Sequence, residues 1–102
     1  FEMKVGCCSI KFFIHGSRSL KEKRRVTKAI KDRVRNKFNV SVAEVGDHDV
    51  WQSLHVGITA VSSDSQYLDG LLNRVVDFID NLHLAEMTDC QIEMISVNHG
   101  KF

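Results

Sequence analysis

The sequence predicts one α+β domain built from two amphipathic helices and four strands. With 102 residues, the chain is long enough for one hydrophobic core and too short for two. Two segments carry apolar residues at a helical period, and four others alternate apolar and polar residues as half-buried strands do. We expect residues 3–98 to form the domain and residues 99–102 to form a tail. Phe1 and Glu2 precede Met3 and are treated as a candidate remnant.

The first strand and the first helix are separated by a short break. Residues 4–14 alternate, with apolar side chains at every second position from 8 to 14, which predicts a strand with one buried face. Ser19 and Glu22 form the S-x-x-E pattern of a capping box, so the helix should begin at Ser19. The helical period then continues to about Phe38, where Asn39 offers a stop.

The second half of the chain repeats this alternation of element types. Residues 40–45 are rich in valine and predict a short strand, and residues 46–49 form a turn cluster. Residues 54–60 alternate as a third strand. A second helix is expected from about Asp64 to His83, capped by Ser63 or Asp64. Alternation at residues 90–95 predicts the last strand.

The element order βαββαβ predicts a ferredoxin-like fold, with a four-stranded antiparallel sheet and two helices on one face. Right-handed crossovers make the first and third strands the central pair. The other face of the sheet is then mixed in character, so that it is either wet or covered by a second copy. We expect this outer face to carry Cys7, Ser9, Lys11, Phe13, His55, Thr59, Glu93 and Ile95.

Charge is segregated along the chain although the net charge is only +1. Ten of the fourteen basic residues, but only two of the thirteen acidic ones, lie between Arg18 and Lys37. On the second helix, Asp69, Asn73, Asp77 and Asp80 share a polar arc, so the molecule should be dipolar. The first helix should carry a basic stripe within an arc of about 120°, formed by Lys21, Arg24, Arg25, Lys28, Lys31 and Arg35.

Three interpretations of the basic stripe stay open at this point. In the first, the cations neutralise the phosphates of a nucleic acid. In the second, the stripe is only the solvent-exposed face of an ordinary surface helix. In the third, it contacts the acidic helix of another copy of the chain. Base stacking on the sheet, as in RNA-recognition motifs, is not favoured, because the outward positions of the third strand are His55, Gly57 and Thr59.

Several other classes of protein lack support in the sequence. Every apolar run is far shorter than the roughly 20 residues of a membrane span, and no secretory signal opens the chain, so we expect a cytoplasmic protein. Three cysteines, an odd number, argue against a disulfide framework and are expected to pack as small apolar side chains. No spacing typical of a metal site and no nucleophile and base pair is recognisable, so we predict no metal, no cofactor and no enzyme.

The strings Ser19-Leu20-Lys21-Glu22-Lys23-Arg24, Phe38-Asn39-Val40-Ser41-Val42 and Trp51-Gln52 resemble the YlxP-like family, domain of unknown function 503. The likeness covers nearly the whole chain and is densest from His15 to Gln52. It implies a ferredoxin-like fold, a cytoplasmic bacterial protein and no established catalytic residues. Members of this family often lie in gene clusters with translation and ribosome-maturation factors.

Two hypotheses of function follow from these observations. The leading one is a non-enzymatic accessory protein that binds structured RNA or a ribosomal subunit through its basic helix, by Arg18, Lys21, Arg24, Arg25, Lys28, Lys31 and Arg35. The alternative is a homodimeric interaction or regulatory module that uses the outer sheet face, at Lys11, Phe13, His55, Thr59 and Ile95.

Overall fold

A computed structural model describes residues 2–98 of the chain. Phe1 and the expected tail at residues 99–102 lie outside the described residues. The elements follow the predicted order, and their bounds are β1 (Glu2–Phe13), α1 (Leu20–Lys37), β2 (Ser41–Gly46), β3 (Ser53–Ser62), α2 (Ser65–Leu82) and β4 (Glu86–Asn98).

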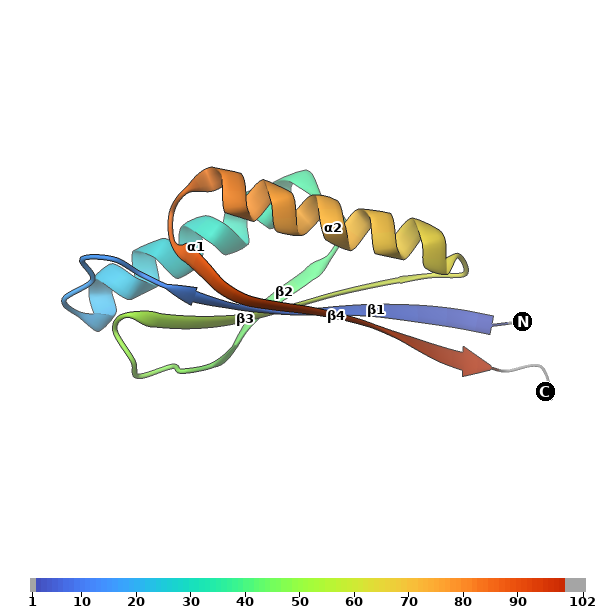
Figure 1. Ribbon diagram of the computed structural model, residues 1–102, viewed down its shortest axis with the longest axis horizontal. Helices are drawn as coiled ribbons and strands as arrows, with labels where there is room; N and C mark the ends of the chain where they lie inside the picture. Colours follow the sequence, from blue (N-terminus) through green and yellow to red (C-terminus); the bar gives the residue numbers. More distant parts are fainter. Residues whose placement is uncertain (1, 99–102) are drawn as a thin grey trace.

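The four strands form one sheet in the order β2-β3-β1-β4, in which every neighbouring pair is antiparallel. Both helices lie on the same side of this sheet (Figure 1). The predicted ferredoxin-like fold is therefore confirmed, with β1 and β3 as the central strands.

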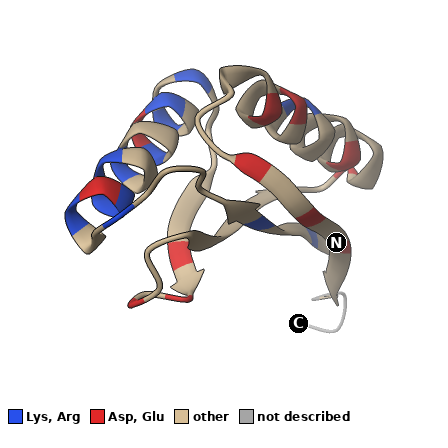
Figure 2. Cartoon of the chain, turned by 60° about the vertical axis from the view of Figure 1, so that its left-hand side comes forward, with Lys and Arg blue, Asp and Glu red and all other residues tan. Residues whose placement is uncertain are grey.

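The hydrophobic core lies between the sheet and the two helices. Alternate residues of the central strands face the helices, as a strand's period of two requires, and they include Ile10, Phe12, Leu54, Val56 and Ile58. Helix α2 approaches β1 closely at Gly6, where a Cβ atom would lie 2.8 Å from Cδ1 of Leu72. The opposite face of the sheet carries no layer of helices (Figure 2).

Both helices begin at the predicted caps. The Ser19 hydroxyl accepts a hydrogen bond from the backbone N–H of Glu22 (3.1 Å), while the Glu22 carboxylate accepts one from the backbone N–H of Arg18 (2.5 Å). Asp64 caps α2 by accepting hydrogen bonds from two backbone N–H groups of the first turn. The side chains thus satisfy donors that a helix start leaves unpaired.

The strands β1 and β4, which hold the two ends of the chain, extend further toward these ends than their apolar patterns predict. β4 was expected at residues 90–95 but runs from Glu86 to Asn98, because it pairs with β1 along nearly its whole length. Glu2 begins β1 and pairs with Asn98, and its carboxylate lies 2.7 Å from the Lys4 ammonium group. Ladder hydrogen bonds with a distant partner extend a strand beyond its apolar alternation.

Candidate functional site

Four basic side chains of α1 line one groove between this helix and the edge strand β2. The groove has a volume of about 440 Å³, and it is lined by Arg24, Thr27, Lys28, Lys31, Asp32, Arg35 and Glu44. Arg24 and Arg35 are eleven residues apart, which is about 16 Å along a helix that rises about 1.5 Å per residue. We call Arg24, Lys28, Lys31 and Arg35 the basic row.

The burial of α1 fixes the direction in which the basic row points. Lys23, Thr27, Ile30 and Val34 form the buried arc of the helix, against the sheet. The basic row lies roughly a quarter turn from that arc, as 100° per residue requires, and so faces the side on which β2 runs. The Arg35 guanidinium donates a hydrogen bond to the Val42 carbonyl (2.8 Å), which ties the end of the row to the sheet edge.

Two of the four cations in the basic row already have partners within the protein: Lys28 forms an ion pair with Asp32, and Arg35 donates to the Val42 carbonyl. Lys28 Nζ lies 2.5 Å from Asp32 Oδ2, and this hydrogen bond holds the pKa of Asp32 below its ordinary value. Arg24 and Lys31 make no ion pair within residues 2–98. Their positive charge is therefore available to an anion in the groove.

The remaining three predicted residues do not line this groove. Arg18 lies in the loop before α1 and is exposed, as are Lys21 and Arg25 on the solvent side of the helix. They extend the positive surface around the basic row without joining its groove.

Lys23 belongs to the basic segment but is not a surface cation, and its side chain is only 2% exposed. Its Nζ donates to the backbone carbonyl of Asp47 and lies 3.1 Å from Glu44 Oε2. Asp47 has a φ of 56°, a left-handed conformation that asparagine and aspartate tolerate better than most residues. Lys23 thus fastens α1 to β2 and to the loop that follows it.

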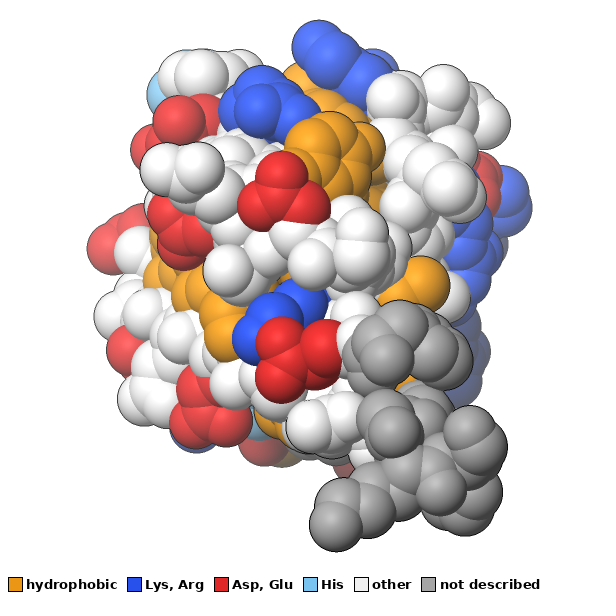
Figure 3. Space-filling view, turned by 90° about the vertical axis from the view of Figure 1, so that its right-hand side faces the viewer, with side chains coloured by type: hydrophobic (Ala, Val, Ile, Leu, Met, Phe, Trp, Pro, Cys, Tyr) orange, Lys and Arg blue, Asp and Glu red, His pale blue; other side chains and the backbone are white. Residues whose placement is uncertain are grey.

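The two helices carry opposite charge. In Figure 2 most of the charged positions on α1 are blue, for Lys and Arg, and most of those on α2 are red, for Asp and Glu. Viewed from the end at which the chain termini lie, acidic side chains gather on the left and basic ones along the right-hand edge (Figure 3). Residues 65–98 contain six acidic residues and one basic residue, so an anionic ligand is attracted to the side of α1.

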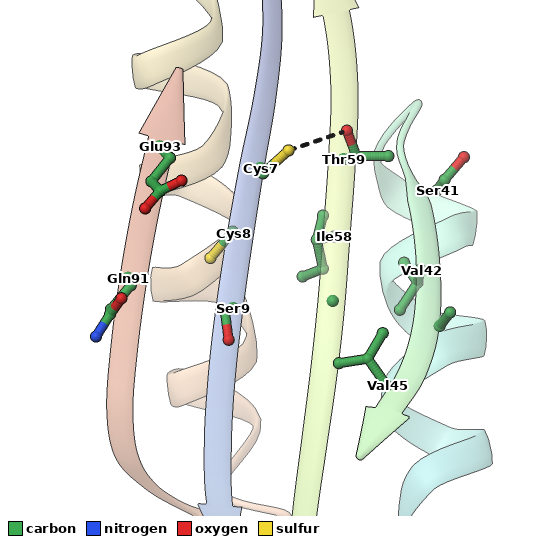
Figure 4. Close-up of a pocket in the computed structure, with 12 residues that line it drawn as sticks. Cys7, Cys8, Ser9, Ser41, Val42, Val45, Ile58, Thr59, Gln91 and Glu93 are labelled. Carbon is green, nitrogen blue, oxygen red and sulfur yellow. Dashed lines mark hydrogen bonds between the residues drawn. The ribbon is translucent and has the colours of Figure 1, made fainter. Parts of the chain in front are cut away.

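The outer face of the sheet contains an open hollow of about 490 Å³. Figure 4 shows its side chains, with Cys7 and Ser9 from β1, Thr59 from β3, and Gln91 and Glu93 from β4. Of the five residues predicted for a partner surface, only Thr59 lines the hollow. By register, Lys11, Phe13 and His55 lie toward one end of the sheet and Ile95 lies toward the other.

A hydrogen bond joins Ser9 and His55 on this face, a pair that the sequence pattern did not reveal. Ser9 Oγ lies 2.7 Å from His55 Nε2, because His55 is two residues from Gly57, the partner of Ser9, and its ring reaches diagonally across to β1. Among residues 2–98, no carboxylate hydrogen-bonds the other nitrogen of His55. The pair therefore lacks the third group that orients the histidine in a catalytic triad.

The three cysteines are free, and they differ in exposure. Cys8 is buried, and burial raises its pKa to about 12, with a further contribution from the Cys90 thiol 3.9 Å away. Cys7 is partly exposed on the outer face, where its Sγ lies 3.9 Å from Thr59 Oγ1. The expectation of buried, apolar cysteines is confirmed for Cys8, while Cys90 is only partly buried against the core. Cys7 lies on the outer face of the sheet, as the alternation of β1 predicted, and is partly exposed there.

Two searches of the described residues complete the survey of sites. Residues 2–98 contain no group of three His, Cys, Asp or Glu side chains arranged to hold a metal ion. In the same part of the chain, neither helix combines the length and the apolar character needed to cross a membrane.

Solved structures with a similar backbone support the fold alone. The designed protein Foldit4 matches with a TM-score of 0.51 at 18% identity, over 94% of this chain and 97% of that one. A second designed protein, LFR1 1, described as having a ferredoxin fold, matches with a TM-score of 0.50 at 10% identity, over 97% of this chain and 89% of that one.

Similarity in sequence is more informative than these structural matches. The uncharacterized protein YlxP of Bacillus subtilis strain 168 is 44% identical over 89 residues, which are 87% of this chain and 97% of that protein. Residues 5–92 match the family described as a protein of unknown function, DUF503. The chain therefore belongs to the DUF503 family, as the resemblance in its first helix and second strand predicted.

Proposed function

We propose that this protein binds structured RNA, in isolation or within a ribosomal subunit, by placing the basic row of α1 against the phosphate backbone. The single observation that carries the proposal is that Arg24, Lys28, Lys31 and Arg35 line one groove along one side of one helix. Aligned cations release condensed counterions from a nucleic acid, and this release supplies most of the affinity for a phosphate backbone.

The distribution of charge supports a long anion over a small one. The four side chains extend about 16 Å along the helix, so they match several consecutive phosphates. Arg18, Lys21 and Arg25 add positive charge beside the row, and the acidic α2 packs over β1 and β3, away from the edge strand β2 that borders the groove (Figure 2). A single carboxylate or phosphate would engage only part of this surface.

The outer sheet face does not offer the alternative mode of RNA binding. Modules of this topology that read single-stranded RNA stack bases on aromatic side chains of the two central strands. Here the outward positions of β3 are Ser53, His55, Gly57, Thr59 and Val61, and the single ring among them, the imidazole of His55, is hydrogen-bonded to Ser9. Phe13 ends β1, and its ring makes an edge contact with His15 at 4.6 Å between ring centroids. We therefore propose that the protein recognises the phosphates and the overall shape of the RNA and makes few contacts to the edges of its bases.

The test is binding to an RNA hairpin and to purified bacterial ribosomal subunits at low salt. The variant Arg24→Glu/Lys31→Glu reverses the two charges of the row that make no ion pair in the described part of the chain, so it should fold and should lose binding at least about tenfold. Circular dichroism checks the fold of each variant.

The matched control is Arg33→Glu/Arg74→Glu, which makes the same change in net charge outside the groove. Arg33 projects from the opposite flank of α1, and Arg74 lies on α2. The control should retain most of the binding. Equal losses in both variants would show that only net charge matters, and unchanged binding in the row variant would overturn the proposal.

A further inference from the structure

The groove of the basic row continues into a smaller pocket beside the N-terminal end of α1. The two hollows share three lining residues, which are Arg24 and Thr27 of α1 and Glu44 of β2. The smaller pocket has a volume of about 190 Å³, and its other lining residues are Leu20, Lys23, His48 and Asp49. His48 and Asp49 belong to the loop between β2 and β3, which lies at the same end of the molecule as the start of α1 (Figure 1). We call this hollow the loop pocket.

One side of α1 borders both hollows. Leu20 and Arg24 are four residues apart and Lys28 follows four residues later, so the three side chains lie along one side of the helix. Leu20 therefore continues the line of the basic row by one turn, about 6 Å toward the start of the helix. There the lining changes from a row of cations to an aliphatic side chain and the loop between β2 and β3.

The loop pocket is balanced in charge, unlike the groove that it joins. Lys23 compensates Glu44, since Lys23 Nζ lies 3.1 Å from Glu44 Oε2. Arg24 and Asp49 then contribute one charge of each sign. A phosphate in this pocket would be repelled by the Asp49 carboxylate, whereas a neutral polar group meets no such repulsion. The loop pocket therefore suits an uncharged group that is attached to an anion held in the neighbouring groove.

Hydrogen bonds hold the loop in place before any ligand arrives. The Asp47 carbonyl accepts hydrogen bonds from Lys23 Nζ and from the Val50 backbone N–H (3.1 Å). The Asp47 carboxylate accepts another from the Ser53 hydroxyl (2.6 Å). A binding site that is already ordered loses less conformational entropy when it binds. The loop thus presents its next two residues, His48 and Asp49, from a fixed position.

His48 and Asp49 offer groups suited to the face and to the edge of a nucleobase. Within residues 2–98, neither side chain makes a hydrogen bond or an ion pair. An imidazole ring is one of the surfaces on which proteins stack unpaired bases, and a carboxylate accepts a hydrogen bond from the amino group of cytosine. The volume of the pocket is below the roughly 300–1,000 Å³ of pockets for drug-sized molecules, so it suits a single ring system.

We propose that the loop pocket binds one unpaired base of the RNA, next to the stretch of backbone held by the basic row. This inference rests on the proposed function and adds a class of RNA to it, a paired stem interrupted by a bulged nucleotide. Arg24 lines both hollows, so it contacts the phosphate of that nucleotide while the base enters the loop pocket. The base lies against His48 and donates a hydrogen bond from its amino group to Asp49. A base that is already unpaired enters without the cost of opening a base pair.

The first test compares two RNA hairpins, one with a fully paired stem and one with a single bulged cytidine in the same stem. We expect the wild-type protein to bind the bulged hairpin about tenfold more tightly, the factor that stacking of one base supplies. His48→Asn/Asp49→Asn should lose most of this preference. The readout is the ratio of the two affinities, because a change in net charge alters the binding of both hairpins alike. Both residues are exposed, so the variant should fold, which circular dichroism checks.

The matched control is Asp80→Asn/His83→Asn, which makes the same two substitutions at the end of α2, outside the groove and the loop pocket. Both residues are exposed, and asparagine tolerates the left-handed conformation that His83 adopts (φ 53°). The control should keep the wild-type ratio of affinities.

A bulged uridine in place of the cytidine tests the contact with Asp49. Uracil presents a carbonyl oxygen where cytosine presents its amino group, so the wild-type protein should bind the uridine bulge severalfold more weakly. Asp49→Asn should bind the two bulges alike, since an amide side chain both donates and accepts hydrogen bonds.

Equal affinity for the paired and the bulged hairpins, equal affinity for the two bulges, or a preference that survives His48→Asn/Asp49→Asn would each overturn this inference. If Arg24→Glu/Lys31→Glu still abolishes binding in that case, the proposed function stands and only the loop pocket is excluded. Failure of the wild-type protein to bind either hairpin would overturn both.

Discussion

Replacing Lys23 with methionine removes a buried positive charge while keeping most of the volume of the side chain. Lys23 is 2% exposed, its Nζ donates to the Asp47 carbonyl, and it lies 3.1 Å from Glu44 Oε2. Without Lys23, the Asp47 carbonyl would lose its donor, and Glu44 Oε2, which makes no hydrogen bond within residues 2–98, would also lose the ammonium group that compensates its charge. Removing one member of a buried ion pair costs about 3–5 kcal/mol.

The structure places the expected cost for Lys23→Met below that range. The Glu44 side chain is 21% exposed, so water partly screens its charge once the lysine is gone, and we expect a loss of about 2–3 kcal/mol in the free energy of unfolding. For a domain of this size that loss lowers the melting temperature by roughly 10–20 °C. Urea denaturation and thermal melting followed by far-ultraviolet circular dichroism measure both quantities.

Two further variants separate the ion pair from other effects of the substitution. Lys21→Met makes the same change at an exposed position of the same helix and should alter stability by less than about 0.5 kcal/mol. Adding Glu44→Gln to Lys23→Met removes the uncompensated carboxylate and should restore about 1 kcal/mol. A Lys23→Met protein as stable as the Lys21→Met control would refute the reasoning.

Three other predictions concern the sheet and its loop. Gly6→Ala should cost about 1–3 kcal/mol of stability in urea denaturation, because the new Cβ would lie 2.8 Å from a leucine methyl group of α2. Iodoacetamide at pH 8 should modify Cys7 and spare Cys8, whose pKa is raised to about 12 by burial and then by a neighbouring thiol; equal labelling in peptide mass spectra would contradict this. Ser53→Ala should raise the pKa of Asp47 in a carboxyl NMR titration, since the Ser53 hydroxyl donates to that carboxylate (2.6 Å) and holds its pKa below the ordinary value. The depressed pKa stabilises the fold above the pKa of the unfolded chain, and this stabilisation is lost as pH falls through the folded value.

The helices could be predicted from local sequence because their signals are local. Ser19 and Asp64 accept hydrogen bonds from N–H groups two or three residues away, and the apolar period depends on neighbours three or four residues apart. The burial of Lys23 was also within reach of this reasoning, since 100° per residue places it on the same arc as Thr27 and Ile30. The residue type alone would not predict this burial, since lysine is almost never fully buried unless it is paired.

Features that depend on distant partners could not be predicted in the same way. The length of β4 follows from its pairing with β1, more than 70 residues away in sequence at each ladder position. The Ser9–His55 hydrogen bond and the hollow over Gly57 need the register of β1 against β3, and a register shift by one residue would move these side chains to the other face. A glycine inside a strand was a signal of close approach, and here it marks the contact with Val45.

The central claim is that the basic row contacts RNA phosphates, and the salt dependence of binding tests it most directly. Four phosphate contacts predict a slope of about −3 in a plot of log K against log salt concentration, and each neutralised cation should reduce its magnitude by a little under 1. The variant Arg24→Gln/Lys31→Gln should therefore show a slope of about −1.5, while Arg33→Gln/Arg74→Gln keeps the wild-type slope. Equal slopes in the wild type and in both variants would contradict the assignment of the basic row to the phosphate backbone.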